Sequence, residues 1–188
     1  PKESKNRIKI LELLVSYGAD IKRVKGKQNL LFEAVDNGQI DLVFYLLDKG
    51  LDWRAAPGSF KRNLLHRAVI AKSLKLVKKT VDLGIDVNTL DGNGKSALYF
   101  TASSDETKLS QEIALYLMGK GAKIKTSNPQ GIDEFFHLAL WTKKDKILTY
   151  CLEKGKIEAN YKNKHGESLL LQAIEYQHTP SVAALLKH

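Results

Sequence analysis

Apolar residues recur along this chain in triples whose spacing is that of an α-helix. In each triple the apolar positions stand seven, four and three residues before a glycine, a spacing that lines one face of a helix. The glycines that follow such triples are Gly18, Gly50, Gly84, Gly121 and Gly155. Because glycine adopts the left-handed conformation that ends many helices at little cost, the pattern predicts five helices that each end shortly before one of these glycines.

A second pattern is a hexapeptide that begins with a polar residue, continues mainly with apolar residues and ends with a small one. Its copies span residues 29–34, 63–68, 96–101, 134–139 and 168–173. Their last residues are 34, 33, 38 and 34 positions apart. Four of the five copies start with Asn or Ser, which are good N-caps. The remaining copy, at residues 134–139, starts with Glu134. Each hexapeptide is therefore predicted to open a further helix.

Together the two patterns predict a repeated unit made of a turn, a first helix, a tight loop and a second helix. Units of this kind stack on their neighbours and share no single central core. We therefore expect an all-α array of helix-turn-helix units joined by projecting turns with short hairpin edges. We expect residues 1–188 to form one array. Its expected units are a partial repeat at 1–23, repeats at 24–56, 57–90, 91–127 and 128–161, and a truncated repeat at 162–188. We also expect the array to continue in a longer protein.

This pattern resembles the ankyrin repeat, which reads approximately Asp-x-x-Gly-x-Thr-Pro-Leu-His-x-Ala, then Gly, then Val-x-x-Leu-Leu-x-x-Gly-Ala. The match is clearest at residues 63–68, 43–50 and 84–88. The copies depart from the family in lacking its Pro, and only His66 and His137 keep its His, a structural position where we expect hydrogen bonds to neighbouring turns. A lysine-rich, divergent segment of this kind is also similar to ankyrin segments of secreted effectors of intracellular bacteria.

The resemblance implies an ankyrin-repeat solenoid that binds a protein partner on its concave face, through turn tips and the ends of first helices. The positions that this implies are Phe60, Arg62, Asn93, Lys95, Asp133, Trp141, His165 and Tyr176. Aromatic and arginine side chains carry most interface energy, so we expect the largest contributions from those types. Trp141 also allows a second interpretation, packing between repeats, which is the role that we expect for Trp53.

Charge adds a second candidate surface. The net charge is +9, and 25 of the 30 basic residues are lysine. Residues 58–90 hold seven basic and two acidic residues, and Lys75, Lys78 and Lys79 are predicted to face solvent on the back of a second helix. They form either an ordinary solvated face or a patch for an acidic protein, a phospholipid or nucleic acid. The lysine bias disfavours nucleic acid, because specific phosphate recognition tends to use arginine.

The third hexapeptide interval, which lies in the repeat at 91–127, is longer than the others. Thr101 and Gly121 are 20 residues apart, whereas the corresponding distance in other units is 16. We expect the four extra residues near residues 103–107, between the two helices, either as a special contact loop or as a tolerated surface insertion.

Little in the sequence points to catalysis. The segment 91–96 mimics the end of a phosphate-binding loop, but Thr89 stands where that motif needs glycine. Five histidines and one cysteine show no paired metal-ligand spacing. Cys151 falls on an apolar stripe, where a thiol is inert. We therefore expect no enzymatic activity, no cofactor and no metal.

The single cysteine also excludes a disulfide within the chain, which suits a reducing compartment. We expect a cytoplasmic location, and the host cytosol if the protein is a secreted effector. No apolar run is long enough to span a membrane. The expected function is that of a monomeric scaffold for a protein partner. The alternative is a segment that regulates or targets an enzyme elsewhere in the parent chain.

Overall fold

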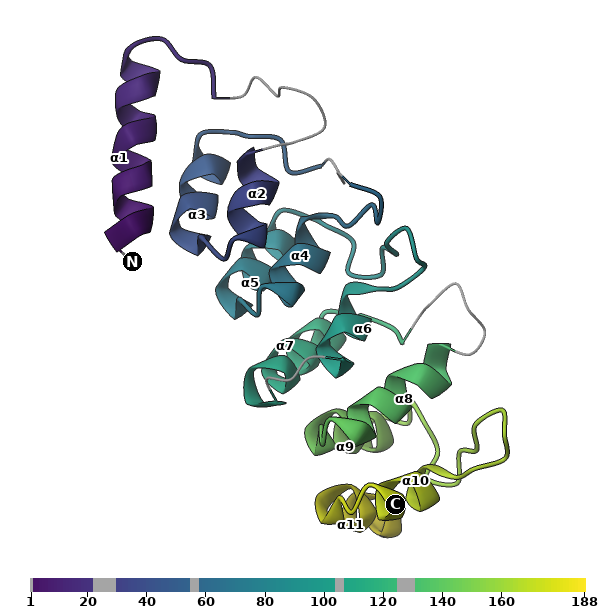
Figure 1. Cartoon of the computed structure of the whole chain (residues 1–188). Helices are drawn as coiled ribbons and strands as arrows, with labels where there is room; N and C mark the ends of the chain where they lie inside the picture. The colour runs from purple at the N-terminus through teal and green to yellow at the C-terminus, as the bar shows by residue number, and fades with distance from the viewer. Residues whose placement is uncertain (1, 22–29, 55–57, 104–106, 125–130) are drawn as a thin grey trace. The chain divides into compact units, whose positions relative to one another are not determined.

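The structure of the chain, a computed structural model, describes residues 2–21, 30–54, 58–103, 107–124 and 131–188 (Figure 1). These residues form eleven α-helices and no strand, and two isolated antiparallel bridges join Leu90 to Ser96 and Lys162 to Ser168. They divide into two compact units, Pro1–Gly84 and Ile85–His188. The expected repeat boundaries after residues 23, 56 and 127 lie outside the described residues.

The first unit consists of two helical hairpins and one preceding helix. Its helices are α1 (Lys2–Ser16), α2 (Leu30–Asp36), α3 (Ile40–Asp48), α4 (Leu64–Ile70) and α5 (Leu74–Asp82). α2 pairs with α3 and α4 pairs with α5, and the first helices α2 and α4 pack against each other (Figure 1). α1 packs against α3, so it takes the place of a second helix, as its apolar triple predicts.

The second unit contains three hairpins of the same kind. Its helices are α6 (Ala97–Ala102), α7 (Thr107–Gly119), α8 (Gly131–Trp141), α9 (Asp145–Glu153), α10 (Leu169–Glu175) and α11 (Thr179–Lys187). The first helices α6, α8 and α10 stack in that order, and the second helices α7, α9 and α11 stack behind them. The predicted helix-turn-helix repeat is thus confirmed within each unit.

The predicted helix ends are confirmed as well. The glycines that follow the second helices adopt left-handed conformations, with φ of 77° at Gly50, 83° at Gly84 and 89° at Gly121. The first helices end in the same way, but mostly without glycine. The left-handed residues there are Gly38 (67°), Lys72 (53°), Lys143 (58°) and Gln177 (53°). Each of the last three places a side chain where glycine fits with less strain.

The apolar triples of α3, α5, α7 and α9 supply most of the interior, whereas Leu14 and Val15 in the triple of α1 are exposed. Val43, Leu46, Val77, Leu117 and Leu148 are all buried. Thr80 replaces an apolar residue at such a position without leaving a polar atom unsatisfied, because its Oγ1 donates a hydrogen bond to the Val77 carbonyl over 2.7 Å. Cys151 is also buried, and burial raises the pKa of its thiol to about 12, against a smaller lowering by Lys156. The thiol therefore stays protonated at neutral pH.

Two details of the sequence prediction are wrong. The fourth hexapeptide does not open its helix, because α8 begins at Gly131, three residues before Glu134. The four extra residues of the third interval do not form only a loop. α7 has 13 residues, whereas α3, α5, α9 and α11 have nine each, so the added length forms about one more turn of helix. Residues 104–106 of that interval lie outside the described residues.

Polar side chains tie successive repeats of the second unit together. Asn88 donates from Nδ2 to the Gly121 carbonyl over 3.2 Å and accepts at Oδ1 from the Lys123 amide over 2.8 Å. Thr142 Oγ1 donates to the Ala102 carbonyl over 2.8 Å, which joins the ends of α8 and α6. These bonds fix the register between neighbouring hairpins.

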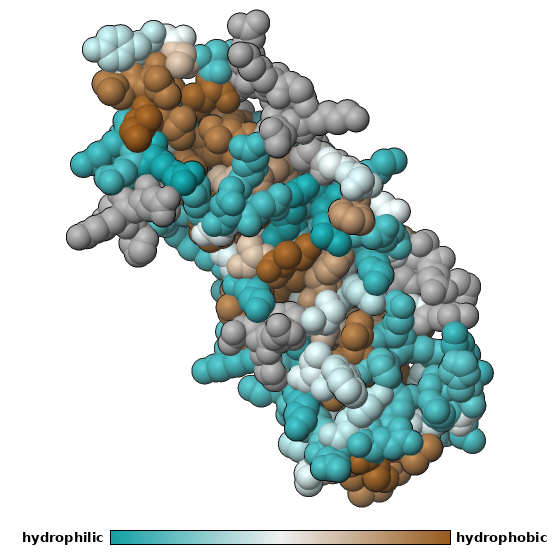
Figure 2. All heavy atoms as spheres, viewed as in Figure 1, coloured by the Kyte–Doolittle hydropathy of each residue, from teal (hydrophilic) through white to brown (hydrophobic). Residues whose placement is uncertain are grey.

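Two helical surfaces expose apolar side chains. Figure 2 shows hydrophobic atoms over α1 and over the hairpin of α10 and α11. Their exposed apolar residues include Ile10, Leu13 and Leu14 on α1, and Leu171, Ile174 and Leu186 on the last hairpin. No helix among the described residues is both long and apolar enough to cross a bilayer.

Candidate binding site on the first helices and fingers

Among the described residues, three turns that precede first helices project as fingers, and the first of these three, residues 58–62, is built on the start of α4. A tight turn closes it, with the Lys61 amide donating to the Gly58 carbonyl over 3.2 Å. The Asn63 side chain caps α4 by accepting from the His66 amide over 3.1 Å, and Asn63 Oδ1 lies 2.7 Å from His66 Nδ1. His66 is fully buried, so this histidine supports the turn from inside.

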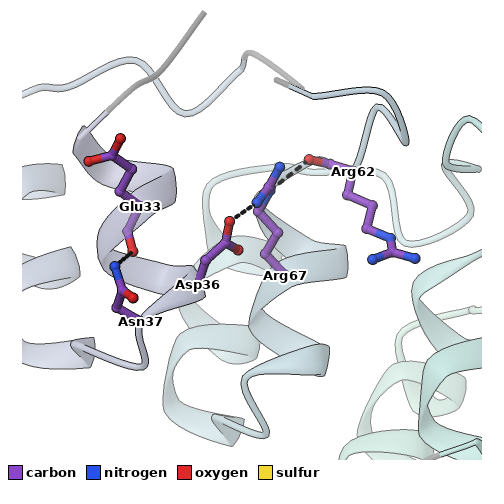
Figure 3. Close-up of polar contacts among 5 residues, drawn as sticks. All are labelled: Glu33, Asp36, Asn37, Arg62 and Arg67. Atoms are coloured by element: carbon purple, nitrogen blue, oxygen red, sulfur yellow. Dashed lines mark hydrogen bonds and ion pairs between the residues drawn. The ribbon is translucent and has the colours of Figure 1, made fainter.

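Arg67 holds the first finger in place. Its Nε donates to the Arg62 carbonyl over 3.2 Å, and its guanidinium pairs with the carboxylate of Asp36 at the end of α2 (Figure 3). The same guanidinium lies 5.3 Å from the centroid of the Phe32 ring. One half-buried side chain therefore connects a finger, its own helix and the first helix of the preceding repeat.

These contacts frame an open groove of about 450 Å³ in the first unit. Its lining residues come from the end of α2, the first finger and the outer turn of α4. They are Val35, Asp36, Gly38, Gly58, Ser59, Phe60, Arg62, Arg67, Ile70 and Ala71. Phe60 is 50% exposed and Ile70 is 42% exposed, which places two large apolar side chains at the rim. The groove thus combines apolar surface with charged hydrogen-bonding groups.

The structure brings the predicted residues Phe60 and Arg62 together at this groove. The Arg62 guanidinium lies 4.8 Å from the centroid of the Phe60 ring. In Figure 3 the Arg62 side chain points away from the ion pair of Asp36 and Arg67. At the end of α2, Asn37 Nδ2 donates to the Glu33 carbonyl over 2.9 Å, and the same carbonyl accepts from the Asn37 amide over 3.0 Å.

The second finger, residues 91–95, contains two predicted site residues, Asn93 and Lys95, whose side chains differ in exposure and contacts. The carboxylate of the buried Asp91 accepts from the amides of Asn93 and Lys95 over 2.9 and 3.0 Å. Asn93 is exposed at the tip. The Lys95 ammonium instead turns back onto Tyr99, 2.9 Å from its hydroxyl and 4.0 Å from its ring centroid. Lys95 therefore braces the finger against α6.

The third finger, residues 163–167, rests on Asp133. One Asp133 oxygen accepts from the Tyr161 hydroxyl over 2.5 Å, and the other accepts from the Lys164 amide over 3.0 Å. Burial, together with the hydrogen bond to and the charge of Asp133, raises the pKa of Tyr161 to about 12. Both Asp133 oxygens are thus used to position the finger, and His165 is exposed at its tip.

The predicted residues Trp141 and Tyr176 meet on the first helices of the second unit. Their ring centroids are 5.3 Å apart with the rings perpendicular, and Trp141 remains 64% exposed. Tyr176 also contacts His137, whose Nδ1 lies 2.9 Å from the phenol oxygen. Trp141 therefore packs against the next repeat, as one of the two sequence interpretations expects, and leaves most of its surface exposed. His137, unlike His66, is exposed.

Sequence reasoning missed Arg67 and Ile70. A signal for Arg67 exists, because Arg67 and Asp36 carry opposite charges and lie 31 residues apart, close to one repeat length. Trp53, expected between units, is half-buried, with the Arg54 guanidinium 4.5 Å from its ring centroid. Lys75 and Lys78 are exposed on α5 as predicted, and Lys79 is half-buried.

In the part of the chain that the structure describes, no group of three or more His, Cys, Asp or Glu side chains could hold a metal ion. What the arrangement offers is a set of exposed aromatic, aliphatic and charged side chains on a firmly braced scaffold. Such composition is typical of protein–protein contact surfaces.

The stacked helical hairpins with projecting fingers define a repeat protein. A family model of ankyrin repeats in three copies matches residues 31–128, just over half of the chain. The chain belongs to the ankyrin-repeat family, as the sequence patterns predict. Ankyrin repeats are generally protein–protein interaction modules, and the family is typically non-catalytic. A search among curated proteins found no significant match.

Proposed function

We propose that this chain is a protein-binding module that holds its partner against the first helices and fingers. The observation that carries the proposal is the groove of the first unit, where exposed Phe60 and Ile70 flank the Arg62 and Arg67 guanidinium groups. Aromatic and arginine side chains at the centre of a contact contribute most of the binding energy in protein interfaces.

The bracing of the groove supports the same proposal. Arg67 ties the finger to α2 and α4, and Asn63 and His66 fix the turn from below. A surface that is already ordered loses little conformational entropy on binding, which favours affinity.

Within the second unit, we propose Trp141 and Tyr176 as the main contacts. Asn93 and His165, exposed at finger tips, are proposed as peripheral contacts. Lys95 and Asp133 are proposed to act indirectly, because their side chains hold their fingers in place. Their substitution would therefore weaken binding by loosening a finger.

The test is a quantitative comparison of proteins captured from cell lysate by the 188-residue chain and by two double variants. Phe60→Ala with Arg62→Ala alters the groove. Lys75→Ala with Lys78→Ala is the matched control on the back of α5. We expect the wild type and the control variant to capture equal amounts of a partner protein. The groove variant should capture at least about tenfold less of that protein. Equal capture by all three, with unchanged circular dichroism, would reject the groove as the contact surface.

The control variant also separates a nucleic-acid or anionic-lipid binder from a protein binder. Binding through Lys75 and Lys78 would be lost in the α5 variant and would fall steeply with salt concentration. The structure places the Lys75 ammonium 4.4 Å from the centroid of the Phe44 ring, so this lysine already covers an aromatic surface of its own unit. We therefore expect the α5 variant to behave as the wild type.

A further inference from the structure

The first helices of the last two repeats carry an unusual charge for this protein. α8 contains Asp133 and Glu134, α10 contains Glu175, and neither helix contains lysine or arginine. Glu167 adds another carboxylate in the finger that precedes α10. In a chain with a net charge of +9, this acidic surface stands apart. Its charge is complementary to that of a basic partner, not an acidic one.

Aromatic rings lie beside these carboxylates. Trp141 packs perpendicular to Tyr176, and Tyr176 packs against His137 with 5.6 Å between ring centroids. Burial, followed by the charges of Glu175 and Glu167, raises the pKa of the Tyr176 phenol. The two carboxylates therefore act at Tyr176, and a cation that approaches this ring would meet both a negative potential and an aromatic face.

Two other aromatic rings of this chain are covered by arginine side chains of the chain itself. Arg54 lies 4.5 Å from the ring centroid of Trp53, and Arg62 lies 4.8 Å from that of Phe60. Within the described ranges, no Lys or Arg of the chain lies over the ring of Trp141 or Tyr176. Among the described residues, Trp141 thus lacks the cation–π contact with a residue of the chain that Trp53 makes.

Lysines also lie near this surface, at positions 143 and 144 after α8 and at positions 162 and 164 around the third finger. Lys144 is buried, and its ammonium donates to Thr142 Oγ1 over 3.0 Å. The charge of Lys143 is felt at His178, which lies on the α10–α11 loop. Lys164 is exposed in the third finger, where its amide is bonded to Asp133.

We propose that Trp141 and Tyr176, with Glu175 and Glu167 beside them, receive an arginine side chain of the protein partner. The guanidinium stacks on the exposed indole of Trp141 and the carboxylates balance its charge. Arginine fits better than lysine because its planar, weakly hydrated group stacks on an aromatic face while it donates hydrogen bonds at its edge. This proposal rests on the proposed function only in treating first helices as a protein-binding face.

The test uses the full 188-residue chain and three blocked, fluorescently labelled peptides, Gly-Arg, Gly-Lys and Gly-Glu, each repeated three times. Affinity is measured by fluorescence anisotropy, and location by the NMR signals of the two indole N–H groups. We expect the arginine peptide to bind most tightly and to shift the Trp141 signal while the Trp53 signal stays in place. Trp141→Leu, and separately Glu175→Gln with Glu167→Gln, should each weaken binding by about threefold or more.

The matched control is Glu112→Gln with Glu153→Gln, which removes two exposed carboxylates from the second helices α7 and α9. It should leave the affinity unchanged. Undetectable binding of the arginine peptide, equal binding of the glutamate peptide, an unmoved Trp141 signal or an equal effect of the control pair would each overturn the proposal. These outcomes do not depend on the groove of the first unit. Failure of the arginine proposal can therefore be distinguished from failure of the proposed function, which the lysate experiment tests.

Discussion

The Arg67 guanidinium pairs with the Asp36 carboxylate across the boundary between two repeats, 31 residues apart in the chain. The arginine side chain is 15% exposed and the aspartate side chain 52%, so the pair is only partly in solvent. Arg67 also holds the Arg62 carbonyl, whereas Asp36 does not. The pair therefore couples repeat stacking to the position of the first finger.

This relationship predicts a measurable coupling energy. A double-mutant cycle with Asp36→Asn and Arg67→Gln should give about 0.5–1 kcal/mol in the free energy of unfolding, the upper part of the range for exposed pairs. Amide exchange at Lys61 should speed up in Arg67→Gln and change little in Asp36→Asn. The exposed pair of Asp52 and Arg54, at 3.6 Å, is the matched control and should give a coupling close to zero. Equal coupling in both pairs would contradict the account.

The left-handed residues after the first helices predict stabilising substitutions. Lys72→Gly, Lys143→Gly and Gln177→Gly should each raise the free energy of unfolding by about 0.5–1 kcal/mol, because a side chain is strained at positive φ. Gly38→Lys, at the equivalent position, should lower it by a similar amount. Urea unfolding of the four variants measures this. Destabilisation by all three glycine substitutions would show that lost side-chain contacts outweigh the strain.

The half-buried side-chain amide of Asn88 is expected to contribute strongly to the free energy of unfolding. Asn88→Ala removes one donor and one acceptor that pair with the backbone at Gly121 and Lys123, so the free energy of unfolding should fall by about 1–3 kcal/mol. Asn160→Ala, at an exposed position of the same unit, should change it by less than about 0.5 kcal/mol. Similar values for the two variants would mean that Asn88 does not join the repeats in solution.

His178 predicts a pH dependence of stability. Its ring is buried, with Nδ1 2.8 Å from Ser181 Oγ. Burial lowers its pKa below the ordinary value of 6.5, against a raising effect of Asp145, and Lys143 lowers it further. Because the unfolded state then binds the proton more readily, stability is fully present above pH 6.5 and is lost as the pH falls toward the lower pKa of the folded state.

The free energy of unfolding should therefore fall between pH 7.5 and pH 5, and His178→Gln should flatten that slope. His165→Gln, at an exposed position, should leave the slope as it is in the wild type. A His178→Gln variant with the wild-type slope would place the pH dependence elsewhere. Denaturant unfolding at several pH values provides the comparison.

The sequence predicts the fold well because its main determinants are local. The apolar triples and Gly50, Gly84 or Gly121 report on contacts within one hairpin, and those features recur with a fixed period. The start of α8 was mispredicted because Glu134 occupies the cap position of the other copies. The acidic residues Asp133 and Glu134 instead stabilise the first turn of a helix that begins earlier.

The surroundings of the candidate site residues could be predicted only in part, for a physical reason. Tip and helix-end positions follow from the repeat, so the sequence predicts where Phe60, Arg62 and Trp141 stand in their repeats. Whether a side chain at such a position faces a partner or its own fold depends on contacts between repeats. Lys95 on Tyr99 and Asp133 on the third finger are examples that no single-repeat pattern contains.

Photo-crosslinking distinguishes a partner that contacts the first helices and fingers from one that contacts the second helices. A benzoylphenylalanine residue placed at position 60, in the groove, should form specific adducts with a partner protein in cell lysate on irradiation. The same residue placed at position 78, exposed on the back of α5, should not. Adducts that form equally from both positions, or only from position 78, would contradict the claim.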